Sequence, residues 1–133
     1  MMFETRTLAE APVVVAPDGS AVRPLCALPG AGSFAHFALV AGEVSKAVVH
    51  ATVQEIWYVV AGAGQMWRRD PASHEEIVAL EPGVCMTIPV GTEFQFRAAA
   101  GAGLEVVAAT MPPWPVDSDT EARAVSGPWD PTF

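Results

Sequence analysis

Turn-forming residues recur along the chain at short, regular intervals, and this spacing limits what the chain can fold into. Prolines and glycines lie between apolar stretches, mostly about eight to twelve residues apart, as at residues 17–19 and 81–83. No amphipathic stretch with a helical period continues for long before another proline or glycine interrupts it. The pattern is typical of short antiparallel strands in a sandwich or barrel, and it predicts an all-β fold.

The segments between these turns have the alternation expected of strands. Strands are predicted near residues 13–16, 22–28, 33–40, 48–52, 55–60, 65–69, 75–80, 84–88, 94–98 and 104–110. In the segment 55–60, Glu55, Trp57 and Val59 share one face, and the alternate residues share the other. Because both faces are largely apolar, we expect this strand to be covered by the barrel interior on one side and by another sheet or subunit on the other.

The composition is that of one folded domain. The chain of 133 residues is 51% hydrophobic and 17% charged, which favours a packed core and a single domain over residues 1–133. We expect a barrel core over residues 24–110 and an N-terminal strand arm over residues 1–23. Residues 111–133 are rich in proline and tryptophan, which favours an extended strap packed on the barrel over a functional lid.

The charge and the apolar runs exclude several classes of partner. Seven basic residues among fifteen acidic ones, with a net charge of −8, cannot form a strong phosphate-binding surface, so no nucleic acid partner is expected. No apolar run is long enough to span a bilayer, and residues 1–10 carry charges where a signal peptide needs apolar residues. We therefore expect a cytoplasmic protein with no membrane partner, in which Cys26 and Cys85 are reduced thiols.

Two segments, residues 42–62 and 81–97, carry a set of residues whose spacing indicates a particular kind of barrel. The set consists of Gly42, His50, Glu55, Gly62, Gly83, Pro89 and Gly91. These residues resemble the two signature motifs of the cupin superfamily, and the chain as a whole resembles its small, single-domain members of the cupin 2 type. The resemblance implies an antiparallel double-stranded β-helix, the jelly-roll or cupin barrel. It also implies that His50 and Glu55 point into the barrel.

Other residues occupy two of the metal-ligand positions of these motifs. The first motif of the family contains His-x-His and a glutamate, the second contains a further histidine, and the four side chains meet around one metal ion. Here the first histidine falls on Val48 and the last on Phe94, so that only His50 and Glu55 remain. Two protein ligands are too few to hold a divalent ion firmly, and no metal cofactor is expected.

A weaker metal centre is the alternative to a metal-free barrel. It would hold a divalent transition metal on His50 and Glu55. Strand alternation places Glu93 on the opposite face from Phe94, so Glu93 completes this centre only if a β-bulge after Gly91 reverses the alternation.

The same residues define an expected ligand pocket. His50 and Glu55 are either a hydrogen-bonded pair that orients or protonates a bound molecule or a catalytically silent ion pair. The expected lining residues of this pocket are Trp57, Met86, Phe94 and Phe96. Such a lining suits a small, partly apolar organic molecule with one polar group.

Three functions are compatible with these residues. The leading interpretation is a barrel that binds a small molecule of unassigned identity without a full metal site. The second is a metal-dependent enzyme of the dioxygenase, isomerase or decarboxylase type, with a centre on His50 and Glu55. The third is a barrel that serves association alone, with its pocket filled by side chains.

A homodimer is expected from two apolar features of the chain. Ile56, Tyr58 and Val60 form an apolar face that points away from the barrel interior, and residues 13–15 are a short, uncharged strand with nothing adjacent in sequence to pair with. Both features are expected at or near a two-fold interface. Single-barrel cupins are commonly dimers, so the resemblance implies the same assembly.

Overall fold

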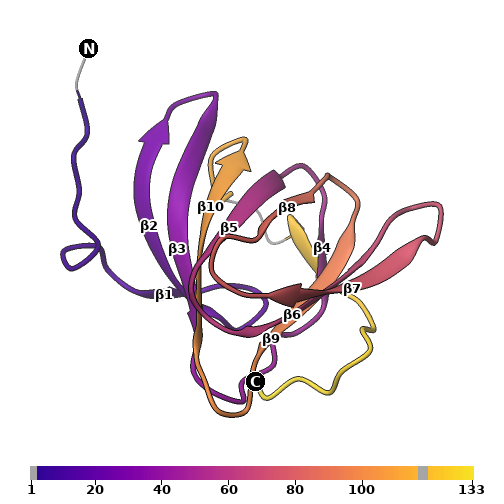
Figure 1. Ribbon diagram of the computed structural model, residues 1–133. Coiled ribbons are helices and arrows are strands. Elements are labelled where there is room, and N and C mark those ends of the chain that lie inside the picture. The colour runs from indigo at the N-terminus through magenta and orange to yellow at the C-terminus, as the bar shows by residue number, and fades with distance from the viewer. Residues whose placement is uncertain (1–2, 117–119) are drawn as a thin grey trace.

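The computed structural model describes residues 3–116 and 120–133, and the regular structure in these ranges consists of β-strands (Figure 1). The strands are β1 (Val14–Val15), β2 (Ala21–Leu28), β3 (Gly32–Leu39), β4 (Val48–His50), β5 (Gln54–Gly62), β6 (Gly64–Arg69), β7 (Glu75–Leu80), β8 (Cys85–Ile88), β9 (Glu93–Ala98), β10 (Leu104–Met111) and β11 (Ala122–Ala124). Residues 1–2 of the expected arm and residues 117–119 of the expected strap lie outside the described residues. Within the described ranges, no helix is long and apolar enough to cross a membrane.

The strands form two antiparallel sheets that pack face to face. One sheet has the order β1-β2-β3-β10-β5-β8 and the other has the order β11-β4-β9-β6-β7. β10 lies between β3 and β5, and β9 lies between β4 and β6, so strands distant in the sequence are neighbours in both sheets. Figure 1 shows β2, β3, β10 and β5 on one side of the barrel and β4, β6, β7 and β9 on the other. The predicted all-β, antiparallel jelly-roll fold is confirmed.

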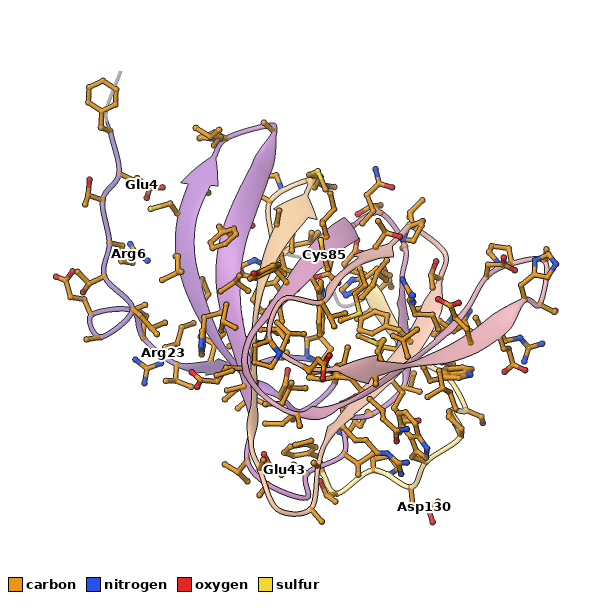
Figure 2. The ribbon with its side chains drawn as sticks, in the orientation of Figure 1. Glu4, Arg6, Arg23, Glu43, Cys85 and Asp130 are labelled. Carbon is orange, nitrogen blue, oxygen red and sulfur yellow. The ribbon has the colours of Figure 1, made fainter. Side chains whose placement is uncertain are left out.

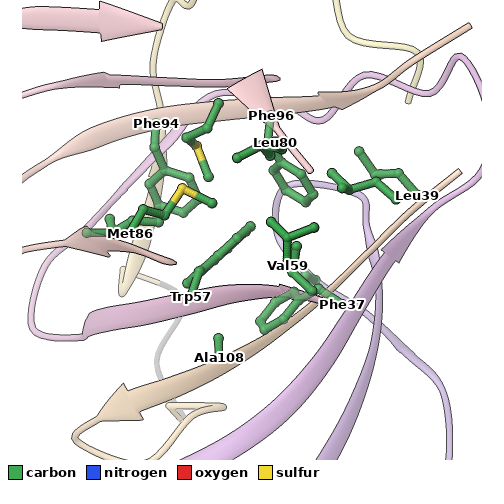
Figure 3. Close-up of a cluster of buried hydrophobic side chains, with 14 of the residues drawn as sticks. Phe37, Leu39, Trp57, Val59, Leu80, Met86, Phe94, Phe96 and Ala108 are labelled. Atoms are coloured by element: carbon green, nitrogen blue, oxygen red, sulfur yellow. The ribbon is translucent and has the colours of Figure 1, made fainter. Parts of the chain in front are cut away.

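The core lies between the two sheets and is dominated by aromatic rings (Figure 3). Trp57 of β5 is stacked on Phe37 of β3, with ring centroids 5.2 Å apart, and meets Phe96 of β9 edge to face at 4.9 Å. Phe94 also packs edge to face against Trp57, at 6.0 Å. Because alternate residues of β5 are buried, Glu55, Trp57 and Val59 share the inner face, as the alternation predicted.

The two ends of the chain are attached to the barrel in different ways. The C-terminal strap crosses the outer side of β9, where the Gln95 amide donates to the Trp129 carbonyl oxygen at 2.8 Å and accepts from the Trp129 N–H at 3.2 Å. The N-terminal arm, which carries Glu4 and Arg6, projects beside β2 (Figure 2). Its contacts include a hydrogen bond from the Ala27 N–H to Glu4 Oε1 at 2.9 Å. The strap thus contributes β11 to one sheet, and the arm contributes β1 and the first residues of β2 to the other.

Candidate functional site

The polar residues of the expected site lie inside the barrel, at a cavity between the two sheets. Val48 and His50 are alternate, buried residues of β4, and Glu55 stands near the start of β5 in the opposite sheet. The cavity is lined by Ala16, Pro17, Asp18, Phe37, Val48, His50, Glu55, Trp57, Phe94 and Trp114. Its volume is about 10 Å³, which is close to the space that one water molecule needs.

The structure brings four of the six expected pocket residues to this cavity. His50, Glu55, Trp57 and Phe94 line it. Met86 and Phe96 belong to the adjacent hydrophobic core instead, where Met86 is paired with Trp57 across β8 and β5. Five lining residues were not singled out from the sequence, namely Ala16, Pro17, Asp18, Phe37 and Trp114. The sequence marked them only as parts of predicted strands, of a turn motif and of a proline-rich tail.

His50 has a different partner from the one expected. Its Nδ1 lies 3.1 Å from Oε2 of Glu121, and the described residues provide no hydrogen bond between His50 and Glu55. Glu121 immediately precedes β11, which pairs with β4 and so brings this carboxylate to the His50 ring. Burial raises the pKa of Glu121, but hydrogen bonds from Thr52, Val53 and His50 outweigh burial and lower the pKa to about 2.

Glu55 lies in the interior without a cationic partner among the described residues. The residue is 5% exposed, and burial raises the pKa of its carboxyl group from 4.5 to about 8. The indole N–H of Trp57 approaches this carboxyl group and offsets part of the rise in pKa, whereas the charge of Asp18 adds to it. Glu55 is therefore largely protonated at neutral pH.

Asp18 reaches the same cavity from the turn between β1 and β2. Its Oδ1 accepts hydrogen bonds from the backbone N–H of Ser20 at 2.9 Å and from the Ser20 hydroxyl at 2.6 Å. Burial raises the pKa of Asp18, and the Ser20 hydrogen bonds offset part of that rise. The cavity thus brings two buried carboxyl groups close to one imidazole ring.

The indole N–H of Trp57 is buried and has no complete hydrogen bond to any described residue. Leaving such a donor unpaired costs about 1–3 kcal/mol, and most buried polar groups avoid this cost. Trp57 lines the cavity beside Glu55, so a molecule bound there can accept this hydrogen bond.

The residues present do not fit a transition metal. Val48 and Phe94 are directly paired across β4 and β9, and the Phe94 ring is stacked on the His50 ring with centroids 6.0 Å apart. Glu93 lies on the other face of β9, with Oε2 3.8 Å from Nε of Arg69. In residues 3–116 and 120–133, no three His, Cys, Asp or Glu side chains converge as metal ligands would.

Comparison with known proteins finds likeness in structure rather than in sequence. No family model and no curated protein matches the chain. Among solved structures, the capsular polysaccharide assembling protein CapF from Staphylococcus aureus superposes with a TM-score of 0.72 at 14% identity over 85% of this chain. The match covers 33% of CapF, so the chain spans about a third of that protein's length.

Two other solved structures match over almost their whole length. Streptomyces PAC13 bound to uridine has a TM-score of 0.71 at 18% identity, over 94% of this chain and 92% of PAC13. PAC13 is described as a nucleoside dehydratase. TT1209 from Thermus thermophilus has a TM-score of 0.64 at 20% identity, over 84% of this chain and 99% of TT1209. CapF, PAC13 and TT1209 are cupin-fold proteins, and this chain, with its motifs and its sheet topology, is a cupin-type β-barrel.

Proposed function

We propose that the barrel binds a small organic molecule against His50, Glu55 and Trp57, without a full set of metal ligands. The observation that carries this proposal is the buried indole N–H of Trp57, which approaches the buried carboxyl group of Glu55 without completing a hydrogen bond to it. Both groups lower the stability of the fold when nothing binds them, and a ligand with hydrogen-bonding groups would compensate both. Two structural neighbours support an organic ligand, since PAC13 was solved with uridine and CapF with the inhibitor 3-isopropenyl-tropolone.

Binding requires the cavity to open, because its volume of about 10 Å³ is too small for an organic molecule. Two short segments line the cavity in addition to the barrel strands, the turn with Pro17 and Asp18 and the strap residue Trp114. The Trp114 ring is only partly buried, with its centroid 6.2 Å from that of Phe37, and opening of the cavity would require this ring to move away from Phe37. A ligand ring that replaces Trp114 against Phe37 would retain most of this apolar contact.

A fragment screen by NMR in the presence of a chelator tests this proposal. Bound fragments are expected to shift the indole N–H signal of Trp57, and Trp57→Phe is expected to weaken their binding roughly tenfold because one hydrogen bond is lost. Trp129→Phe is the matched control, since that ring lies outside the barrel beneath the Arg97 guanidinium. Equal binding by both variants would contradict the proposed site.

A barrel that serves association alone is the second candidate, and the small cavity is the observation that favours it. In that case the side chains inside the barrel fill its interior at all times. The same screen separates the two functions, because an association-only barrel gives no fragment that shifts the Trp57 signal in the wild-type protein.

We also propose a homodimer, formed through the outer face of β5 and its neighbours. Residues 13–15 were expected to lack a strand partner, but Val14 and Val15 pair with β2 of the same chain. Ile56, Tyr58 and Val60 are 44%, 47% and 42% exposed on this face. An apolar groove of about 660 Å³ lies beside the N-terminal arm and includes Phe34 of β3 and Phe3 of the arm. A second copy would bury these side chains, and stable interfaces bury at least about 1,200 Å² in total.

Light scattering at low micromolar concentration is expected to give the mass of a dimer. Tyr58→Glu should produce a monomer, because it places a charge in the centre of the interface. Ile77→Glu is the matched control, since Ile77 is 50% exposed on β7 of the other sheet and should leave the dimer intact. A wild-type monomer would refute the proposed interface.

A cytoplasmic location is part of the same proposal. Cys26 and Cys85 are free thiols, and Cys85 is exposed on the surface. An exposed, unpaired thiol is most compatible with a reducing compartment.

A further inference from the structure

A buried carboxylate from the C-terminal strap holds the imidazole ring of His50. Glu121 Oε2 lies 3.1 Å from His50 Nδ1 and also accepts the backbone N–H groups of Thr52 at 3.1 Å and Val53 at 3.2 Å. The Thr52 hydroxyl donates to the other carboxylate oxygen. The side chains of His50 and Glu121 are only 9% and 6% exposed. The carboxylate is therefore held on both oxygens and cannot turn away from the ring without breaking several hydrogen bonds.

These contacts determine which ring nitrogen of His50 carries the proton. The hydrogen bonds lower the pKa of Glu121 to about 2, so its carboxylate can only accept at neutral pH. Nδ1 of a neutral His50 must then be the donor, and Nε2 has a free lone pair. The orientation of the ring is further limited by Phe94, whose ring plane is inclined 16° to that of His50.

Nε2 lies across the ring from Nδ1, on the side away from Glu121. His50 is an inward-facing residue of β4 and lines the cavity together with Asp18 and Glu55. The described residues provide no hydrogen bond to Nε2. Nε2 thus has no hydrogen-bond partner among the described residues, and His50 lines the cavity whose walls also contain the Trp57 N–H.

We propose that Glu121 is a positioning residue that keeps His50 in the Nδ1-protonated form, with Nε2 turned into the cavity as the acceptor for a ligand hydroxyl or amide N–H group. The ligand part of this inference rests on the proposed function, whereas the Glu121–His50 arrangement does not require a ligand. Trp57 supplies a donor on the same cavity, and Glu55, with its pKa raised to about 8 by burial, supplies another. A ligand that fits these three groups carries a hydroxyl or N–H next to a carbonyl, as in a lactam or a hydroxy-carbonyl compound.

The nitrogen chemical shifts of the histidine rings test this inference in the free protein. The chain has three histidines, which makes assignment direct. In its neutral form, His50 is expected to show a protonated Nδ1 and an unprotonated Nε2. His36 provides an internal reference of the opposite kind, because its Nε2 lies 2.9 Å from the Glu105 carboxylate on the outer face of the sheet.

Variants separate positioning from simple packing. Glu121→Ala removes the acceptor, so the proton of His50 should distribute over both nitrogens. Glu121→Gln retains an acceptor oxygen and should restore the wild-type pattern. Glu105→Gln is the matched control. Glu105 contacts the His36 ring and not the His50 ring, so this substitution should leave the His50 shifts unchanged.

Two results would overturn the inference. One is a wild-type His50 that carries its proton on Nε2, and this measurement stands even if Glu121→Ala does not fold. The other is a folded Glu121→Ala protein whose His50 shifts equal those of the wild type. Neither measurement uses a ligand. If the fragment screen finds no ligand but His50 shows the expected protonation pattern, the proposed function is rejected and the positioning role of Glu121 stands.

Discussion

Replacing Glu55 with glutamine is expected to raise the free energy of unfolding by about 3–5 kcal/mol above pH ~8 and to change it little near pH ~4. The carboxyl group ionises near 4.5 when exposed and near 8 in the folded protein, because burial disfavours its charge. Between these two values the folded state binds the proton that the unfolded chain has released. The stability that Glu55 contributes is thus fully present below its unfolded pKa and is lost as the pH rises through its folded pKa.

Urea denaturation over a series of pH values measures this effect. The wild-type protein should lose stability between about pH 4.5 and pH 8, and Glu55→Gln should lose much less, because an amide does not ionise in this range. Glu81→Gln is the matched control, since Glu81 is exposed and its replacement should leave the pH profile unchanged. Identical profiles for the wild type and Glu55→Gln would place the Glu55 carboxyl group in contact with solvent.

The double substitution Val48→His with Phe94→His is expected to turn the barrel into a metal-binding protein. Val48 and Phe94 are paired across β4 and β9, and both side chains are buried in the interior. The Phe94 ring is stacked on the His50 ring. Together with His50 and Glu55, the new side chains would supply four ligands, which is enough for zinc or nickel.

Calorimetric titration with zinc measures this gain. We expect micromolar or tighter binding and a rise in Tm on metal addition that offsets part of the stability lost with the Phe94 ring. Val48→His alone is the control and should bind at least tenfold more weakly, because it lacks the fourth ligand. If the folded double variant shows no affinity for metal, the two positions do not face His50 and Glu55.

The fold could be predicted from the sequence because its signals are local. Turn residues and alternation predicted the segments that form β1 to β10, including the two faces of β5. The short strand β11 was not predicted, because its sequence Ala-Arg-Ala contains no β-branched or aromatic residue. Its strand conformation comes from pairing with the edge of β4, which only the folded barrel provides.

The site could be predicted only in part, because its most specific contacts join distant segments. The alternation correctly placed Phe94 inside the barrel and Glu93 on the other face of β9. The partner of His50 was not predicted, since Glu121 lies 71 residues further along the chain and no spacing pattern connects the two. Gln95 lies two residues from Glu93 along β9, but the strap covers it and the residue is fully buried.

The metal content of the wild-type protein, purified without chelators and dialysed, tests the central claim of a metal-free ligand site most directly. Only His50 and Glu55 remain of the family's metal ligands, so well under one equivalent of iron, manganese, nickel or zinc per chain is expected. The double variant Val48→His with Phe94→His, treated in the same way, provides the positive reference. A near-stoichiometric content of any of these metals in the wild-type protein would contradict the account.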